Sequence, residues 1–289
     1  METMRDIRNR MKSVHQSLQV TSAMKLISTA KLRKARRRLD ETLPYFEAVR
    51  GAIREIEVYA GGNGEKWFDR RERKEDRRVA TLVITADKGL AGGYNHSLIR
   101  FAEEHCPRGS ILLLLGAVGK RYFIEKDYRL MEDFAVSTKE PTFYEASEIA
   151  AFAASQFISG GIDDFRVIFT RMHSTVKLEP EMITLLPLDV ETISAPGRRS
   201  LEDTVYSYEP DEESLFDVLV PHYLKGIVYG ALVQAFASEQ AARMTAMDSA
   251  SKNADDMLDR LQLVYNRARQ AAITSEVSEI VAGAAALED

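Results

Sequence analysis

The two ends of the chain each carry a long stretch that contains neither glycine nor proline. The first stretch covers residues 1–43 and the second covers residues 231–282, and the residues between them hold nearly all of both residue types. Glycine and proline are the residues that most often interrupt helices, so stretches rich in Ala, Lys, Arg, Gln and Leu favour helix here. A helix over the second stretch would be about 78 Å long at 1.5 Å per residue. A helix of this length is too long for a compact domain to enclose, and it therefore needs a partner.

Apolar residues in both stretches recur at the alternating three- and four-residue spacing of a coiled coil. The expected N-terminal seam is Ile7, Met11, Val14, Leu18 and Thr21, followed by a shift to Met24 and Ile27 because Lys25 takes the next strict position. The expected C-terminal seam is Ala250, Ala254, Met257, Leu261, Val264, Ala268 and Ala271. Both ends lead into the same middle segment. We therefore expect a long antiparallel coiled coil of the N- and C-terminal helices, wound left-handed.

The middle of the chain has the pattern of an α/β domain. Apolar runs at 78–86, 110–116 and 165–173 have the composition of buried strands, and 182–188 is a fourth candidate. Helical patterns lie between these runs, which predicts an open, largely parallel sheet. The expected domains are an N-terminal coiled-coil helix, 1–60; a Rossmann-like α/β domain, 75–190; a linker loop, 191–210; and a C-terminal coiled-coil helix, 211–289.

Positive charge is concentrated at the N-terminus. Residues 1–38 hold eleven Lys and Arg residues against two acids, a local charge of +9, in a chain whose net charge is −5. Six of these basic residues lie in KLRKARRR, and we call residues 31–38 the basic collar because their helical angles place the charges all around a helix. Alternatives are an ordinary solvated surface, a nucleic-acid-binding arm and a mitochondrial presequence. No aromatic residues are interleaved for base stacking, and the helical pattern continues past Arg38 without a cleavage boundary. Contact with acidic protein surfaces fits this geometry better.

Other features of the composition limit the class of protein. The longest purely apolar run, ILLLL at 111–115, is too short to cross a bilayer, so we expect no membrane-spanning segment. Cys106 is the single cysteine, which excludes an internal disulfide and suits a reducing compartment.

Two glycine-containing turns raise the question of a bound phosphate. TADKGLAGGYN at 85–95 follows a predicted strand and could offer backbone N–H groups, but it has neither GK[ST] nor GxGxxG spacing. GAVGK at 116–120 is followed by Arg121 instead of Ser or Thr. The histidines lack metal-ligand spacing, and no nucleophile, base and oxyanion donor are grouped. We expect no catalytic, cofactor-binding or metal-binding residues. The alternative is a nucleotide-binding α/β enzyme that uses the 85–95 turn.

Four stretches resemble, in the same order, the gamma subunits of F-type ATP synthases. IRNRMKSVHQSLQVTSAMKLISTAKLRKAR at 7–36 is similar to the start of that family, and ITADKGLAGGYNHSLIR at 84–100 to its middle signature. VYSYEPDEESLFDVLVPHYL at 205–224 is similar to the segment that enters the long C-terminal helix. Residues 238–287, which include LQLVYNRARQAAIT, resemble the C-terminal end of the family. The resemblance spans almost the whole chain.

This resemblance implies a rotor shaft that is not itself an enzyme. In this family the two terminal helices stand inside a ring of three alpha and three beta subunits, where ATP is made or hydrolysed. The middle domain sits at the foot, beside the epsilon subunit and the c-ring. The implied function is to couple ion-driven rotation of the c-ring to the alpha/beta catalytic sites. No cofactor and no nucleic acid is implied, and membrane contact occurs only through the c-ring. The chain begins almost directly at the first helix of the family, so we expect the cytoplasmic face of a bacterial plasma membrane.

The resemblance also implies roles for individual residues. The positions implied in contact with beta or in torque transfer are Met24, Lys31, Arg33, Lys34, Arg36, Arg243, Arg269, Gln270, Thr274 and Glu276. The positions implied in contact with epsilon and the c-ring are Tyr206, Tyr208 and Glu209. For Arg243 and the positions from 269 to 276, plain packing between the two helices is an equally good interpretation. The chloroplast-type insertion with its cysteine pair is absent, so no thiol switch of that kind is expected.

Overall fold

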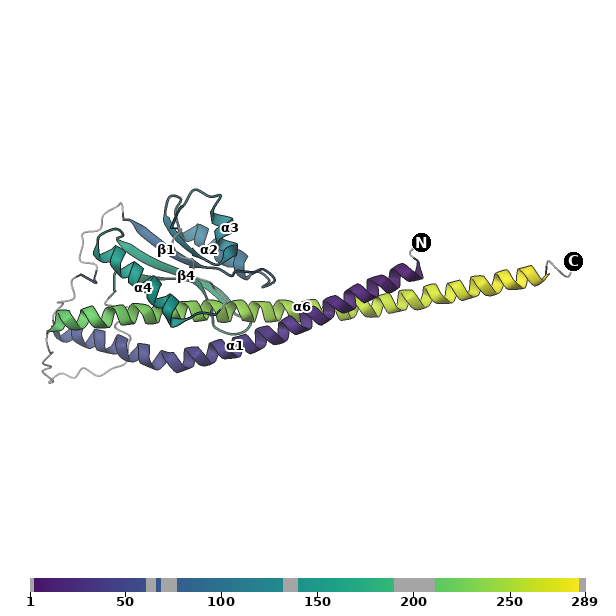
Figure 1. The fold of residues 1–289 in the computed structure, drawn as a ribbon, viewed down its shortest axis with the longest axis horizontal. Coiled ribbons are helices and arrows are strands. Elements are labelled where there is room, and N and C mark those ends of the chain that lie inside the picture. The colour runs from purple at the N-terminus through teal and green to yellow at the C-terminus, as the bar shows by residue number, and fades with distance from the viewer. Residues whose placement is uncertain (1–2, 61–65, 69–76, 132–139, 190–210, 286–289) are drawn as a thin grey trace. The chain divides into compact units, whose positions relative to one another are not determined.

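The computed structural model describes residues 3–60, 66–68, 77–131, 140–189 and 211–285 (Figure 1). Its elements, in chain order, are α1 (Met4–Ala60), β1 (Val79–Ile84), α2 (Tyr94–His105), β2 (Ile111–Leu115), α3 (Ala117–Phe123), β3 (Arg129–Met131), α4 (Phe143–Ile158), β4 (Asp164–Met172), β5 (Leu178–Leu186) and α6 (Glu212–Ala285). The expected fold class is confirmed: long antiparallel terminal helices and a middle domain with an open, largely parallel sheet.

The chain divides into two compact units, which differ from the expected domain ranges. The helical unit comprises Met1–Ser28 and Arg243–Asp289, and the α/β unit comprises Thr29–Ala242. Both long helices contribute to each unit, so part of each helix packs with the sheet and part of it does not. The expected division at 60/75 and 190/211 stays a prediction, and the linker 191–210 lies outside the described residues.

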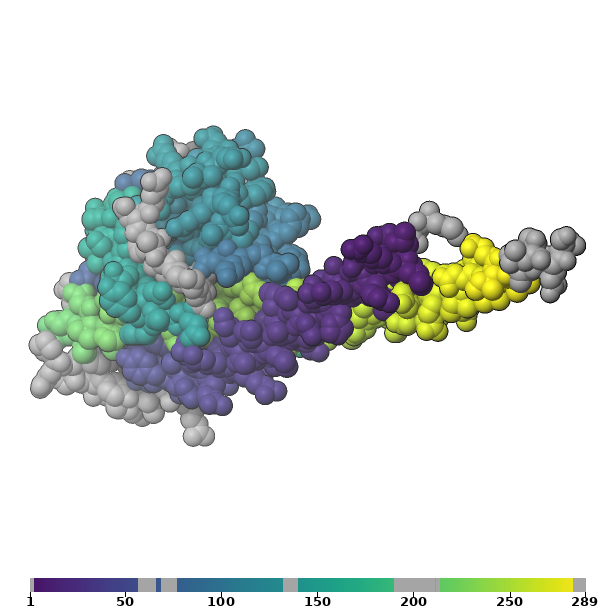
Figure 2. Space-filling view, turned by 45° about the vertical axis from the view of Figure 1, so that its right-hand side comes forward, coloured from purple at the N-terminus to yellow at the C-terminus, as the bar shows by residue number. Residues whose placement is uncertain are grey.

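In the helical unit, α1 and α6 pair in antiparallel directions. A guanidinium nitrogen of Arg8 lies 2.6 Å from the Tyr265 hydroxyl. Farther along, the hydroxyls of Thr21 and Ser251 are 2.8 Å apart. The residue numbers of each facing pair add up to 272 or 273, which is what a constant antiparallel register requires. Figure 2 shows the purple start of α1 packed along α6.

The seam on α1 follows the expected positions from Ile7 to Thr21 and then keeps its strict spacing. Lys25 is half-buried and Ser28 is buried, whereas Ile27 is 56% exposed. The expected shift to Ile27 is therefore wrong. A shift was not needed because Lys25 has an acidic partner, Asp248, on α6 at 2.6 Å.

The seam on α6 is partly as expected. The positions that face inward are Met247, Ser251, Ala254, Leu258, Leu261, Tyr265, Ala268 and Ala272. Met257, Val264 and Ala271 were expected here and are wrong, since Met257 and Val264 are 43% and 44% exposed and Ala271 is exposed as well. In each case the next residue, Leu258, Tyr265 or Ala272, takes the inward position. Two adjacent residues of similar hydropathy give the same spacing pattern, and only contacts such as Arg8 with Tyr265 decide between them.

The α/β unit is built on a five-stranded sheet in the order β3-β2-β1-β4-β5. β1 pairs in parallel with both β2 and β4, β2 pairs in parallel with β3, and β5 runs antiparallel to β4. β2 and β4 lie on opposite sides of β1 in the sheet, with α2 and α3 on one face and α4 on the other, as Figure 1 shows. The short β3 was not expected, and β5 begins four residues before the expected 182–188.

Apolar side chains fill the space between the sheet and its helices. On the α2 and α3 face, Val83, Leu98, Leu112, Phe123 and Ile168 belong to one buried cluster. At the start of α4, Thr142 and Glu145 form a capping box, in which each side chain bonds to the backbone N–H of the other residue. The α/β unit therefore has a core that does not depend on the helical unit.

One described helix has the length and composition of a possible membrane span. The segment Ser214–Ala282 of α6 contains an 18-residue window with a mean hydropathy of 1.2. The longest purely apolar run did not indicate this window, because isolated polar residues interrupt it. Of this window, 56% is buried inside the structure, as is usual for a core helix of a globular protein.

Within the α/β unit, α1 and α6 are in close contact at Gly226. A Cβ atom added there would overlap the ring of Phe46. Phe46 in turn stacks on Phe143 of α4 with ring centroids 6.4 Å apart. The glycine thus removes a side chain where an aromatic residue from the other helix must fit.

We expect Gly226→Ala to lower the Tm of the full chain, because the Phe46 ring must move out of its stack. Gly230→Ala is the matched control, since a Cβ there meets nothing within 4 Å. That control gains about 0.8–1 kcal/mol of helix propensity and should raise the Tm. Thermal melts followed by circular dichroism measure both. A higher Tm for Gly226→Ala would contradict the close packing of α1 on α6.

Candidate functional site

The start of α3 is the first place to look for a bound phosphate. Its Ala117 N–H donates to the Asp87 carboxylate at 3.2 Å, and the Gly119 N–H donates to the Thr85 hydroxyl at 3.0 Å. Between them, the Val118 N–H donates to the Ala86 carbonyl at 3.1 Å. These are the donors that a phosphate at a helix start would use. Oxygen atoms from the segment after β1 already occupy all three.

The glycines of GAVGK also have a packing explanation. Gly116 has a φ of 88°, and a Cβ atom there would overlap the carbonyl oxygen of Thr85. A Cβ atom at Gly119 would lie 2.7 Å from the Thr85 hydroxyl oxygen. Both glycines therefore allow the end of β1 to touch α3. They are not needed to admit a ligand.

The second place is the carboxyl edge of the sheet beside β1. The strand order reverses at β1, and open α/β sheets bind their ligands at such a point. Here α6 occupies this edge. Ser238 donates a hydrogen bond to the Thr170 carbonyl at 2.8 Å, and Ala242 packs against Ala86 and Ala91. The geometry gives no support to the alternative of a nucleotide-binding enzyme that uses the 85–95 turn.

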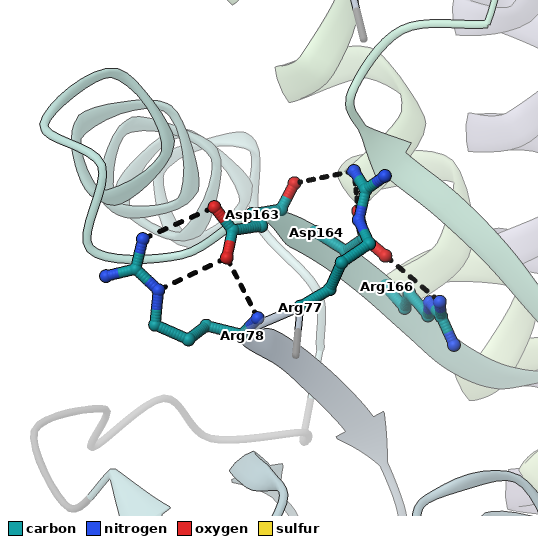
Figure 3. Close-up of polar contacts among 5 residues, drawn as sticks. All are labelled: Arg77, Arg78, Asp163, Asp164 and Arg166. Carbon is teal, nitrogen blue, oxygen red and sulfur yellow. Dashed lines mark hydrogen bonds and ion pairs between the residues drawn. The ribbon is translucent and has the colours of Figure 1, made fainter. Parts of the chain in front are cut away.

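Among the described residues, no group of three or more His, Cys, Asp or Glu side chains could hold a metal ion. Charged side chains instead form a network of ion pairs at the opposite edge of the sheet, in which Asp164 is buried (Figure 3). There, Asp164 pairs with Arg77 at 2.6 Å and with Arg166 at 3.0 Å, while Asp163 accepts bonds from the Arg78 side chain and backbone N–H. These five residues tie the first residues of β1 and β4 together. Adjacent opposite charges were the signal for these residues that the sequence offered.

The structure divides the basic collar into paired and exposed residues. Lys34 lies 2.9 Å from the carboxylate of Glu140, and Arg38 lies 3.6 Å from the same carboxylate. The hydrogen bond from Lys34 is the main cause that lowers the pKa of Glu140. Arg33 and Arg36 are exposed. The collar thus offers charge to the surroundings even though part of it is satisfied within the α/β unit.

The inner side of the collar is closed. A hollow of about 10 Å³ is lined by Lys31, Lys34, Ala35, Arg38, Glu140, Pro141, Val233 and Phe236. This volume admits at most about one water molecule. A partner can therefore reach the collar only from its outer side. Sequence reasoning missed Glu140, because nothing in the order of residues connects it to α1.

The remaining expected site residues fall into three groups. Met24 and Lys31 are half-buried, and Arg243 is 9% exposed. Arg269, Gln270, Thr274 and Glu276 are exposed on α6. By the register of the facing pairs, Met4, the first residue of α1, lies opposite residue 268 or 269. The roles of Gln270, Thr274 and Glu276 stay a prediction. Tyr206, Tyr208 and Glu209 lie outside the described residues.

A polar layer interrupts the apolar seam of the helical unit. Lys25 and Lys252 both reach the Asp248 carboxylate, at 2.6 and 2.9 Å. The bond from Lys25 is the largest cause and the bond from Lys252 the second, and together they lower the pKa of Asp248 from 3.8 to about 2. Thr21 and Ser251 pair one turn away. Such a layer favours one register, because a shifted helix would separate the ions.

These contacts define a class of protein: a long antiparallel helix pair that carries an α/β domain whose usual ligand edge is filled by one of the helices. The family model described as ATP synthase matches residues 3–287. The chain is 43% identical over 290 residues to the ATP synthase gamma chain of Ruminiclostridium cellulolyticum, covering 99% of both. It is 38% identical to the sodium ion specific ATP synthase gamma chain of Acetobacterium woodii, again covering 99% of both. The chain belongs to the ATP synthase gamma chain family.

Solved structures agree on the fold. The central stalk and c-ring structure of the Tetrahymena thermophila mitochondrial ATP synthase contains a chain with a TM-score of 0.57 and 24% identity, which covers 80% of this chain and 99% of that one. A chain in the Euglena gracilis OSCP/F1/c-ring structure has a TM-score of 0.63 and 18% identity, and covers 98% of this chain and 94% of that one.

We expect Lys25→Met to raise the pKa of Asp248 from about 2 toward 3.8, because it removes the largest cause of the shift. Lys252→Met should raise it less. Since the pKa is lowered in the folded state, the stabilisation is present above about pH 4 and is lost as the pH falls through about 2. The pKa of Asp248 is measured by carboxyl carbon NMR over a pH titration of the unchanged chain and of both variants. An unchanged pKa in Lys25→Met would contradict the ion pair.

Proposed function

We propose that this chain is the central shaft of an F-type ATP synthase and has no catalytic site of its own. The paired terminal helices would stand within a ring of three alpha and three beta subunits. The middle domain, residues 75–190, would sit at the foot, next to an epsilon subunit and a c-ring. Rotation of the c-ring would turn the shaft, and the shaft would change the nucleotide affinities of the alpha/beta sites in sequence.

The observation that carries this proposal is the free end of α6. Ile273, Val277, Ile280 and Val281 lie on one face of the helix and are 51% to 70% exposed. By the register of the facing pairs, the described part of α1 starts opposite residue 268 or 269, before this segment. An apolar helix face of this kind is usually covered by another chain. A ring of subunits that encloses the helix end would cover it.

A single pair of helices has no threefold symmetry, so the shaft would be asymmetric within such a ring. An asymmetric rod cannot present one face to three identical subunit pairs at once. A partner that contacts the states of each pair differently changes their populations. By linkage, nucleotide occupancy must push back on the angle of the rod. Turning and catalysis are then coupled without any chemistry on this chain.

The residues assigned to contact the ring differ in accessibility: Arg33 and Arg36 are exposed, whereas Arg243 is buried. Arg33 and Arg36 on the basic collar, with Lys31 and Lys34, would face an acidic segment of each beta subunit. Met24, Arg243, Arg269, Gln270, Thr274 and Glu276 would act higher on the shaft. Exposed ion pairs contribute about 0–1 kcal/mol each, so a beta subunit could release the collar as the next one engages it.

The foot of the shaft would meet the membrane sector. Tyr206, Tyr208 and Glu209 are assigned to contacts with epsilon and the c-ring on the strength of the family resemblance. The chain itself would then be peripheral, on the cytoplasmic face of a bacterial plasma membrane, and would touch the bilayer only through the c-ring. The ranges 1–60 and 211–289 would form the shaft and 75–190 the foot domain.

Replacing Arg33 and Arg36 with Gln should weaken coupling in the reconstituted enzyme by about two- to tenfold, since two exposed ion pairs are lost from each contact. Arg108→Gln with Arg129→Gln is the control, because it removes the same charge from exposed positions of the α/β unit. The measurement is the ratio of ion transport to ATP hydrolysis, in complexes that contain one copy of this chain for three alpha and three beta subunits.

Equal coupling in the collar variant and the control would show that the collar is ordinary solvated surface. Failure of the unchanged chain to enter a complex of that stoichiometry would contradict the proposed function itself.

A further inference from the structure

We propose that Gln234 and Ser238 of α6, together with Tyr94 of α2, form a joint that fixes α6 to the α/β unit and transmits torque between them. The inference rests on the proposed function, because a joint carries torque only in a chain that turns. It assigns a mechanical role to three polar residues that the resemblance to known shafts does not single out. They act as positioning residues, since they hold α6 and touch no substrate.

Three hydrogen bonds make up the joint. The Ser238 hydroxyl donates to the carbonyl of Thr170 at 2.8 Å. The Gln234 side-chain oxygen accepts from the backbone N–H of Met172, the last residue of β4, at 3.3 Å. At the start of α2, which follows β1, the Tyr94 hydroxyl donates to the carbonyl of Ala235 at 3.1 Å. Residues 234–238 of α6 are therefore bonded both to the end of β4 and to Tyr94, the first residue of α2.

Burial makes these bonds costly to break. Ser238 is fully buried and Tyr94 is 6% exposed. A buried polar group that loses its partner keeps the cost of leaving water without the compensating bond. Apolar contact alone is non-directional and would let a helix slip against a sheet. Rotation of α6 about its axis, or sliding along it, would break all three bonds.

Small residues bring the two surfaces close enough for these bonds. Ala242 packs against a buried cluster of Ala86, Ala91 and Tyr94. Ala235 is 2% exposed and Ala241 is fully buried. The polar residues thus sit within an otherwise alanine-rich contact, at the sheet edge where a ligand would bind in other α/β domains. In this chain the edge binds the chain's own helix.

The test compares two bead positions on the shaft in a rotating alpha/beta complex. One bead is attached through Val176→Cys, at an 88% exposed position in the β4–β5 connection, and the other through Val218→Cys, at a 59% exposed position on α6. The native Cys106 is buried and stays unlabelled. The angular variance of each bead is recorded during the pauses of ATP-driven rotation.

In the unchanged chain both beads should show the same variance. In Ser238→Ala with Gln234→Leu, the variance of the Val176→Cys bead should rise about twofold, because one of the three bonds remains. The Val218→Cys bead should not change, since it sits on α6 itself. Ile99→Val is the control: it trims the core between the sheet and α2, away from α6, and should lower the Tm without changing either variance.

Equal variances at both positions in the joint variant would overturn the proposal. A rise at both positions would also overturn it, because the added compliance would then lie in α6 itself. If the double variant does not assemble, Ser238→Ala alone removes a single oxygen atom and is judged by the same comparison. Absence of rotation with the unchanged chain would contradict the proposed function, which is a separate outcome.

Discussion

The antiparallel register between α1 and α6 is the constraint on which the other features depend. In the helical unit it is held by an apolar seam and by a polar layer, where Lys25 and Asp248 meet at 2.6 Å. In the α/β unit it is held by the fit of Phe46 over Gly226. Apolar seams tolerate a shift by one heptad, whereas an ion pair and an aromatic ring over a glycine do not. The register also determines how much of α6 extends past the start of α1.

The α/β unit shows how a ligand-binding topology can serve a mechanical purpose. Its sheet has the order and crossovers of doubly wound domains, but oxygens of Thr85, Ala86 and Asp87 take the N–H groups at the start of α3. The edge beside β1 holds α6. The fold therefore does not indicate the function, which depends on what occupies the site. Here the groups that fill the site belong to the chain itself, and they attach α6 to the sheet.

The sequence predicted the long helices, the parallel strands and most of the α1 seam, because these depend on periodicity and on the absence of glycine and proline. The prediction failed where two adjacent residues of similar hydropathy could both take the inward position of the seam. Met257 and Leu258 are both apolar, and only the position of α1 decides which one turns inward. The partners of Lys34, Ser238 and Asp164 could not be predicted, since each lies in a distant part of the chain. Gln234 and Ser238, polar residues among the alanines at the start of the 231–282 stretch, were a signal for the joint.

The central claim is that α1 and α6 turn as one rod in a fixed register. The most direct measurement is disulfide formation in the full chain between Thr21→Cys and Ser251→Cys, whose hydroxyls are 2.8 Å apart, followed by rotation of the cross-linked chain in the complex. We expect a rapid intrachain cross-link, little cross-linking between Thr21→Cys and Met244→Cys one heptad away, and unimpaired rotation after locking. Preferential cross-linking of the shifted pair, or loss of rotation when the register is locked, would contradict the central claim.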